Sequence, residues 1–256
     1  MRQFDHETPN LARMYDYMLG GKDNFAVDRQ AIEQLAELIP EAVPLAHANR
    51  AFLQRAVRYV AAAGVSQFLD LGSGLPTQGS AHEVAPEAGV VYVDHDPVVA
   101  AHARALLGTP GRAAFVQADL LDPDAVLAQA GRFLDLREPV GVLLVSILHF
   151  LPDSARPQRA VARLCERLAP GSHLVITHAT SMGRLEDGQR YRGAATENPG
   201  SGTDRTPAEI RAFFGDFPLE PPGLVQAVDW RPDRPKLVGD WSLPSSLMAG
   251  VGKKPL

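Results

Sequence analysis

The first stretch of this sequence with the residue types for chemistry is a glycine turn, FLDLGSGLPT, at residues 68–77. An apolar run leads into Gly72, Ser73 and Gly74, and glycines at such a turn let a backbone come within contact distance of a ligand. Asp94 ends the next apolar run, twenty residues after Gly74. An acid at that distance accepts both ribose hydroxyls of an adenosine-containing cofactor. The pattern therefore predicts a nucleoside site.

Three residues around this turn indicate which cofactor it takes. The dinucleotide fingerprint has a third glycine where this chain has Thr77, and Pro76 removes one N–H from the turn. Asp70 places a carboxylate two residues before the first glycine, where it repels phosphate and suits an ammonium group. S-adenosylmethionine (SAM) carries an ammonium and a sulfonium and no phosphate. The turn therefore favours SAM over NAD.

Further candidate cofactor residues follow other apolar runs. Asp119, with Leu120, is placed to hold the adenine, and His95 is expected to pack near the adenosine. Ser146, at the end of a fourth run, is also assigned to the cofactor. The alternative is structural, because Asp94 is also an ordinary strand-end carboxylate and Asp119 a possible cap for the helix that follows.

The apolar pattern predicts the scaffold that positions these residues. Short apolar runs bounded by turn signals predict buried strands at residues 67–72, 89–96, 113–120, 140–147 and 172–179. Helical patterns lie between them, for example at residues 97–108 and 154–171. Strand alternating with helix predicts an α/β fold with a Rossmann-like, doubly wound, mostly parallel sheet. In such a sheet the candidate residues converge on one crevice at the carboxyl ends of the strands.

The segments flanking this alternation complete the expected domain. Two helices are predicted before the first strand, residues 29–39 with Asp28 as a cap and residues 44–64. Later, a polar loop at 181–204 precedes a helix start at Thr206 and an edge strand at 223–230.

No linker separates two domains. We therefore expect a single domain over residues 1–256, with 1–64 as an N-terminal helical lid and 65–256 as the core, including the loop insertion at about 181–204.

Composition and charge exclude several classes of function. The net charge of −5 argues against a nucleic-acid or anionic-membrane partner, since either needs a basic face. No apolar run is long enough to cross a bilayer, and no signal-peptide pattern begins the chain. A single cysteine, Cys165, fits a reducing compartment, so we expect a cytoplasmic protein. Because the histidines and the cysteine lack ligand spacing, no metal is predicted. The oligomeric state stays open.

Three motifs together resemble one family. The stretches ARMYDYMLGGKDNFAVDR, LDLGSGLPT and VVYVDHDPVV are similar to those of bacterial SAM-dependent methyltransferases formerly designated a domain of unknown function. The resemblance covers roughly residues 5–250, and the N-terminal motif is the specific part of it. It implies the class I methyltransferase fold and SAM as cofactor. It leaves the methyl acceptor unidentified, and we expect a small molecule.

In this fold, elements before the first strand commonly cover the cofactor, so the resemblance implies that residues 15–25 act as a lid. Tyr15 or Phe25 would then lie against the sulfonium, Gly21 would allow close backbone approach, and Lys22 or Asn24 would face the carboxylate. The alternative is that the glycine pair ends a helix and the aromatic rings belong to the core.

Candidates for catalysis are fewer. His149 and His178 each follow a predicted strand and are the histidines best placed to act as a general base, although each also fits a structural role.

Arg50 is a candidate to bind the methionine carboxylate of the cofactor, or else a solvated helix residue. Acceptor specificity is expected in the polar loop, which contains Tyr191, Arg192 and Glu197. This expectation rests on the position of the loop alone. Two rivals stay open, an NAD-dependent oxidoreductase and a module that senses SAM without transferring its methyl group.

Overall fold

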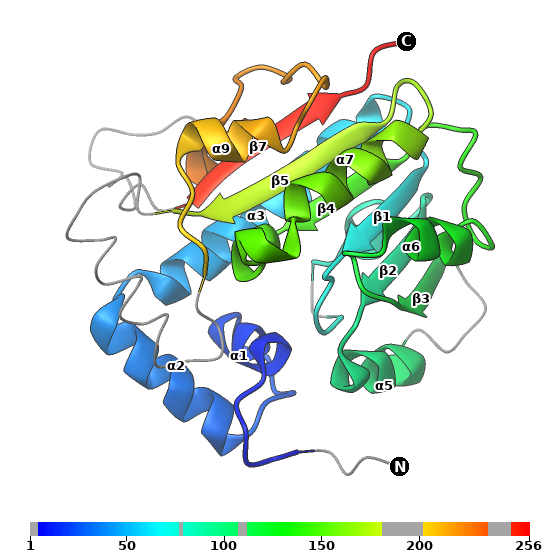
Figure 1. Ribbon diagram of the computed structural model, residues 1–256. Helices are drawn as coiled ribbons and strands as arrows, with labels where there is room; N and C mark the ends of the chain where they lie inside the picture. Colours follow the sequence, from blue (N-terminus) through cyan, green and yellow to red (C-terminus); the bar gives the residue numbers. More distant parts are fainter. Residues whose placement is uncertain (1–4, 77–78, 107–111, 181–201, 235–246) are drawn as a thin grey trace.

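A seven-stranded sheet forms the centre of the computed structural model, which describes residues 5–76, 79–106, 112–180, 202–234 and 247–256 (Figure 1). The strand order is β3-β2-β1-β4-β5-β7-β6. Neighbours from β3 to β5 pair in parallel, while β7 runs antiparallel to both β5 and β6. The predicted Rossmann-like, mostly parallel sheet is thereby confirmed. The strands are β1 (Gln67–Leu71), β2 (Gly89–Asp94), β3 (Ala113–Gln117), β4 (Gly141–Val145), β5 (His173–Ala179), β6 (Val225–Gln226) and β7 (Leu247–Lys253).

Helices cover both faces of this sheet. On one face lie α3 (Ala42–Ala62), α4 (Ala81–Val84) and the short turn η3 (Ala227–Asp229). On the other lie α6 (Pro123–Ala130), α7 (Pro157–Arg167) and α9 (Pro207–Ala212), which Figure 1 shows in front of the strands. A further helix, α5 (Pro97–Leu106), contacts β3.

Burial on both faces explains why the strands read as continuous apolar runs. Within β1, Phe68 joins the core under α3, whereas Leu69 and Leu71 join the core under α6 and α7. All three are 2% exposed or less. Two-sided burial is the normal state of a parallel sheet, and it removes the polar alternation of a half-exposed strand.

Two more helices lie beyond the sheet at its carboxyl edge. They are α1 (Leu11–Met18) and α2 (Ala26–Leu38), the blue helices of Figure 1, and we call them the helical lid. The sequence predicted α2 and α3, whereas it gave a helix at α1 only as the alternative, in which the glycine pair ends a helix. Asp28 is the third residue of α2 rather than its cap, since the helix begins at Ala26. From there its carboxylate accepts a hydrogen bond from the backbone N–H of Phe25, the residue before the helix, at 2.8 Å.

The far edge of the sheet differs most from the expectation. The predicted edge strand at 223–230 is paired only at Val225–Gln226, and a 3-10 turn follows it. The strand between β5 and β6 is the unpredicted β7. It contains Gly250 and Gly252, and Cβ atoms at these positions would lie 3.1 and 2.9 Å from the ring of Phe214. Close packing of α9 therefore requires the glycines that weaken the strand pattern.

Candidate functional site

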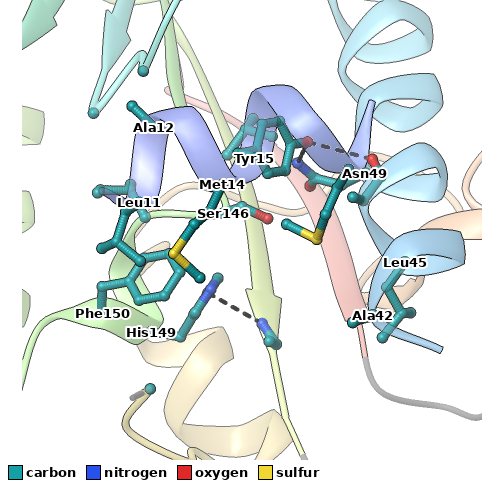
Figure 2. Close-up of a pocket in the computed structure, with 18 of the residues that line it drawn as sticks. Leu11, Ala12, Met14, Tyr15, Ala42, Leu45, Asn49, Ser146, His149 and Phe150 are labelled. Carbon is teal, nitrogen blue, oxygen red and sulfur yellow. Dashed lines mark hydrogen bonds between the residues drawn. The ribbon is translucent and has the colours of Figure 1, made fainter. Parts of the chain in front are cut away.

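A cavity of about 480 Å³ opens at the carboxyl ends of β1, β2 and β4, under the helical lid (Figure 2). The strand order reverses direction between β1 and β4, and ligands bind at such a switch point in open α/β sheets. The volume of the cavity falls within the range of about 300–1,000 Å³ that is usual for small-molecule sites.

The glycine turn forms one wall of this cavity. Gly72 and Gly74 have φ angles of +67° and +63°, which L side chains rarely adopt. A Cβ at Gly72 would lie 2.4 Å from the Ile147 side chain, so no larger residue fits. At Gly74 the nearest atom to such a Cβ is that of Ala12, 3.9 Å away, so the backbone is open to a ligand there.

Asp94 holds the turn against β2. Its Oδ2 accepts a hydrogen bond from the Gly74 N–H at 2.9 Å, and its Oδ1 accepts one from the Asp96 N–H at 3.0 Å. The Asp94 carboxylate lines the cavity, as does Ser73. His95, the residue after Asp94, also lines it, and its side chain is 77% exposed. The turn and the acid that the sequence paired by spacing therefore do meet at one wall.

A second carboxylate, Asp70, lies deeper in the same wall. Burial raises its pKa to about 7, the positive charge of Arg50 opposes that rise, and the nearby Asp94 adds to it. Arg50 projects from α3 and lines the cavity, and its guanidinium carbon is 5.7 Å from the centre of the Tyr15 ring. Near neutral pH, Asp70 therefore responds to any charge placed beside it.

A chain of hydrogen bonds beside the cavity links the sheet to the lid. The Ser146 N–H donates to the Thr177 hydroxyl at 2.8 Å, and that hydroxyl donates to Asn49 Oδ1 at 2.6 Å. Asn49 Nδ2 donates to the Tyr15 hydroxyl at 2.8 Å, which donates to the carbonyl of Ala46 at 3.3 Å. Ser146 adopts a left-handed φ of +57° that carries its side chain to the cavity wall. These contacts tie α1 and α3 to the ends of β4 and β5.

Two polar contacts fix the other end of the lid, one to the loop after β2 and one between its two helices. Asn10 caps α1 with its side chain, and its Nδ2 donates to Asp96 Oδ2 at 2.5 Å. Arg13 forms an ion pair with Asp28 at 2.7 Å, and both side chains are fully buried. Burial raises the pKa of Asp28, but hydrogen bonds from Arg13 and from the N–H groups of Phe25 and Asn10 outweigh it and hold that pKa below its ordinary value.

The N-terminal motif divides into a part at the cavity and a part away from it. Tyr15 lines the cavity, whereas Gly21, Lys22, Asn24 and Phe25 lie outside its described lining. Phe25 is 39% exposed, and its ring packs edge-on against the ring of His6.

The turn after α1 is organised by a buried acid that the sequence reasoning missed. Asp16 Oδ2 accepts hydrogen bonds from the Asp23 N–H and from Asn24 Nδ2, each at 2.9 Å. A Cβ at Gly21 would lie 1.9 Å from this carboxylate, while Gly20 ends the helix with a φ of +79°. The glycine pair therefore serves the connection between α1 and α2.

The two candidate histidines have different surroundings. His149 lines the cavity, and its Nδ1 accepts a hydrogen bond from the Ala179 N–H at 3.3 Å (Figure 2). Burial lowers its pKa well below the ordinary value, aided by His178 and Arg205. With Nδ1 accepting from the backbone, the neutral ring carries its proton on Nε2, where it can donate a hydrogen bond.

His178 lies outside the described lining and is fully buried. Its Nδ1 is 2.6 Å from the carbonyl of Ala179, and its Nε2 is 3.0 Å from Arg205 Nη1, so both ring nitrogens are engaged. Burial lowers its pKa to about 4. This environment is that of a structural residue.

Other candidates lie outside the cavity lining or outside the described residues. Asp119 is exposed and turns its carboxylate to the Leu121 N–H at 2.9 Å, and neither it nor Leu120 is part of the described lining. Tyr191, Arg192 and Glu197 lie outside the described residues.

Sequence reasoning also missed polar residues that build the site, namely Asn10, Asn49, Asp96 and Thr177. Two of them had a local signal as capping residues, Asn10 before an apolar run and Asp96 directly before the proline that begins α5.

Two negative findings concern the described residues. They contain no group of three or more His, Cys, Asp or Glu side chains that could hold a metal ion. None of the helices found among them has the length and apolar character that a bilayer crossing requires.

Comparison with known proteins adds a family to this geometry. The profile of a family described as S-adenosyl methyltransferase matches residues 1–255. A candidate methyltransferase from Thermobifida fusca is 43% identical, with a TM-score of 0.91 over 98% of this chain and 97% of that one. A DUF574 family protein from Streptomyces avermitilis is 37% identical, with a TM-score of 0.90 over 99% and 100% of the two chains.

More distant structures share the fold alone. The N-methyltransferase NodS from Bradyrhizobium japonicum is 16% identical, with a TM-score of 0.53 over 84% of this chain and 99% of that one. No protein with a curated description is a significant match.

Proposed function

Because this chain belongs to the S-adenosyl methyltransferase family, whose methyl donor is SAM, we propose that its cavity holds SAM beside a small-molecule methyl acceptor. In this proposal the cofactor lies along the glycine turn. Asp94 accepts hydrogen bonds from the ribose hydroxyls, and Gly72, Ser73 and Gly74 face the methionine end.

The observation that carries the proposal is the set of charges at this wall. Among the described residues that line it, Asp70, Asp94 and Asp96 supply three carboxylates and Arg50 supplies one cation. This set repels a pyrophosphate, which disfavours NAD. It suits a ligand with an ammonium, a sulfonium and one carboxylate, since Asp70 attracts the ammonium and Arg50 pairs with the carboxylate.

SAM supplies an electrophilic methyl group when bound, and the protein's own residues then position the acceptor in line with it. Alignment alone lowers a barrier by about 7–11 kcal/mol. The lid excludes water above the crevice, and the hydrogen-bond chain through Asn49 fixes Tyr15 beside it. His149, as an Nε2–H donor, orients the acceptor oxygen or nitrogen. That atom forms its bond to the methyl carbon as the methyl–sulfur bond breaks, and its own proton is lost to solvent.

Calorimetric titration with SAM, S-adenosylhomocysteine and NAD tests this proposal. We expect both sulfur ligands to bind, NAD not to bind, and Asp94→Ala to weaken both sulfur ligands at least about tenfold, or about 1.4 kcal/mol. Clear NAD binding, or no response to either sulfur ligand, would contradict the proposal. A screen for S-adenosylhomocysteine formation with small-molecule acceptors then separates a transferase from a sensor, which would bind SAM without turnover.

A further inference from the structure

We propose that the methyl acceptor is a neutral, mainly apolar small molecule with one hydroxyl or aromatic amine group. Its binding site is the lid side of the cavity, here called the apolar chamber. This inference rests on the proposed function, since it assigns the space beside the cofactor.

The chamber is the part of the cavity lined by Met14, Met18, Ile32, Leu35, Leu45 and Phe150. These side chains come from α1, α2, α3 and the turn after β4, so the chamber exists only with the lid in place. Figure 2 shows Leu11, Met14 and Phe150 on one side and Ala42 and Leu45 across from them.

Charge is distributed unevenly between the two sides of the cavity. Every described lining residue that α1 and α2 supply is uncharged, as are Ala42, Leu45 and Ala46 at the start of α3. The charged lining residues Arg50, Asp70, Asp94 and Asp96 lie at the glycine wall, and the exposed Asp204 lies at the end of the polar loop. Burying an unpaired charge in apolar surroundings is costly, so the chamber selects against ions.

Polar groups at the inner end of the chamber indicate how the acceptor is oriented. Tyr15 and Asn49 are engaged with each other and with their neighbours. Ser146 and His149 also line the cavity, and His149, whose Nδ1 accepts from the Ala179 N–H, has its N–H donor on Nε2. A few placed polar groups in an otherwise apolar pocket fix orientation. The acceptor therefore places its single polar group toward Ser146 and His149 and its apolar body toward α2.

Two fluorescent probes that differ by one charge test this inference. N-phenyl-1-naphthylamine is neutral, and 8-anilino-1-naphthalenesulfonate is the same ring system with a sulfonate. With S-adenosylhomocysteine saturating the protein, we expect the neutral probe to bind at least about tenfold more tightly than the anion. Leu35→Lys should weaken the neutral probe by at least about tenfold and leave S-adenosylhomocysteine affinity within about twofold.

Leu38→Lys is the matched control, because Leu38 ends the same helix, is 45% exposed and lies outside the described lining. It should change neither affinity. Equal binding of the two probes, or the same result for both lysine variants, would overturn the inference. If Leu35→Lys loses its circular dichroism signal, Leu45→Lys tests the opposite wall with the same expectation. Failure of S-adenosylhomocysteine to bind would instead refute the proposed function.

Discussion

At the scale of single residues, Asp70 links cofactor binding to pH. Its folded pKa of about 7 lies above the ordinary value of 3.8, so below about pH 7 the Asp70 carboxyl is mostly protonated until a ligand favours its ionised form. A ligand ammonium favours the ionised form. We therefore expect affinity for S-adenosylhomocysteine to rise about tenfold between about pH 6 and about pH 8, with proton release. Calorimetry in buffers of different ionisation enthalpy measures both effects.

Asp70→Asn provides the control for this prediction, because an amide does not titrate in this range. Its binding should be independent of pH, and a flat profile for the wild-type protein would contradict the prediction. Stability has the opposite sign. The folded state binds more protons than the unfolded state between pH 3.8 and about 7, so the contribution of Asp70 to stability is lost as pH rises through that window.

Sequence spacing identified residues whose partners lie on neighbouring strands. Gly74 and Asp94 are twenty residues apart, yet β1 and β2 pair in parallel and bring their ends together. The same reasoning did not separate Tyr15 from Lys22, because closeness in sequence does not show which side of a helix end faces a cavity. The position of Lys22 outside the lining depends on the turn after α1. That turn is held by the buried carboxylate of Asp16, which accepts hydrogen bonds from residues 23 and 24.

At the scale of elements, the buried Arg13–Asp28 pair should dominate the stability of the lid. Arg13→Met leaves a buried carboxylate without its cation, and we expect it to cost about 3–5 kcal/mol in the free energy of unfolding of the lid. Adding Asp28→Asn removes that charge while keeping a hydrogen-bond acceptor, so the double variant should be more stable than Arg13→Met alone. Hydrogen exchange of the α1 and α2 amides at increasing urea concentration measures the free energy of unfolding of the lid in both variants.

The exposed pair of Arg58 and Asp233 is a matched comparison at the same N···O distance of 2.7 Å. Its side chains are 48% and 70% exposed, so Arg58→Met should cost no more than about 1 kcal/mol. Equal costs for the two arginine variants would show that burial does not set the strength of the lid's ion pair.

Elements with strong apolar periodicity were predictable, whereas those defined by tertiary packing were not. The parallel strands β1 to β5 follow from their apolar runs. By contrast, β7 contains glycines that admit the ring of Phe214, and this requirement becomes visible only when α9 is packed against the sheet. The short helix α1 carries a polar N-terminal cap whose partner, Asp96, is distant in sequence.

At the scale of the whole molecule, the place of α3 decides where the lid ends and the core begins. We propose that residues 1–256 form one folding unit in which α3 belongs to the core. Its Phe52, Val57 and Val60 are fully buried in the cluster that covers one face of the sheet. Removal of residues 1–64 therefore exposes that face, whereas removal of residues 1–40 deletes only α1 and α2.

Two truncated chains test this boundary. Residues 41–256 should keep a cooperative thermal transition, bind S-adenosylhomocysteine at least about tenfold more weakly, and lose the neutral probe, because the chamber walls from α1 and α2 are gone. Residues 65–256 should lack a cooperative transition, since the loss of α3 leaves Phe68 and Val90 of the sheet uncovered. A cooperative transition in 65–256 would place α3 in the lid. Unchanged probe binding in 41–256 would mean that α1 and α2 do not form the acceptor site.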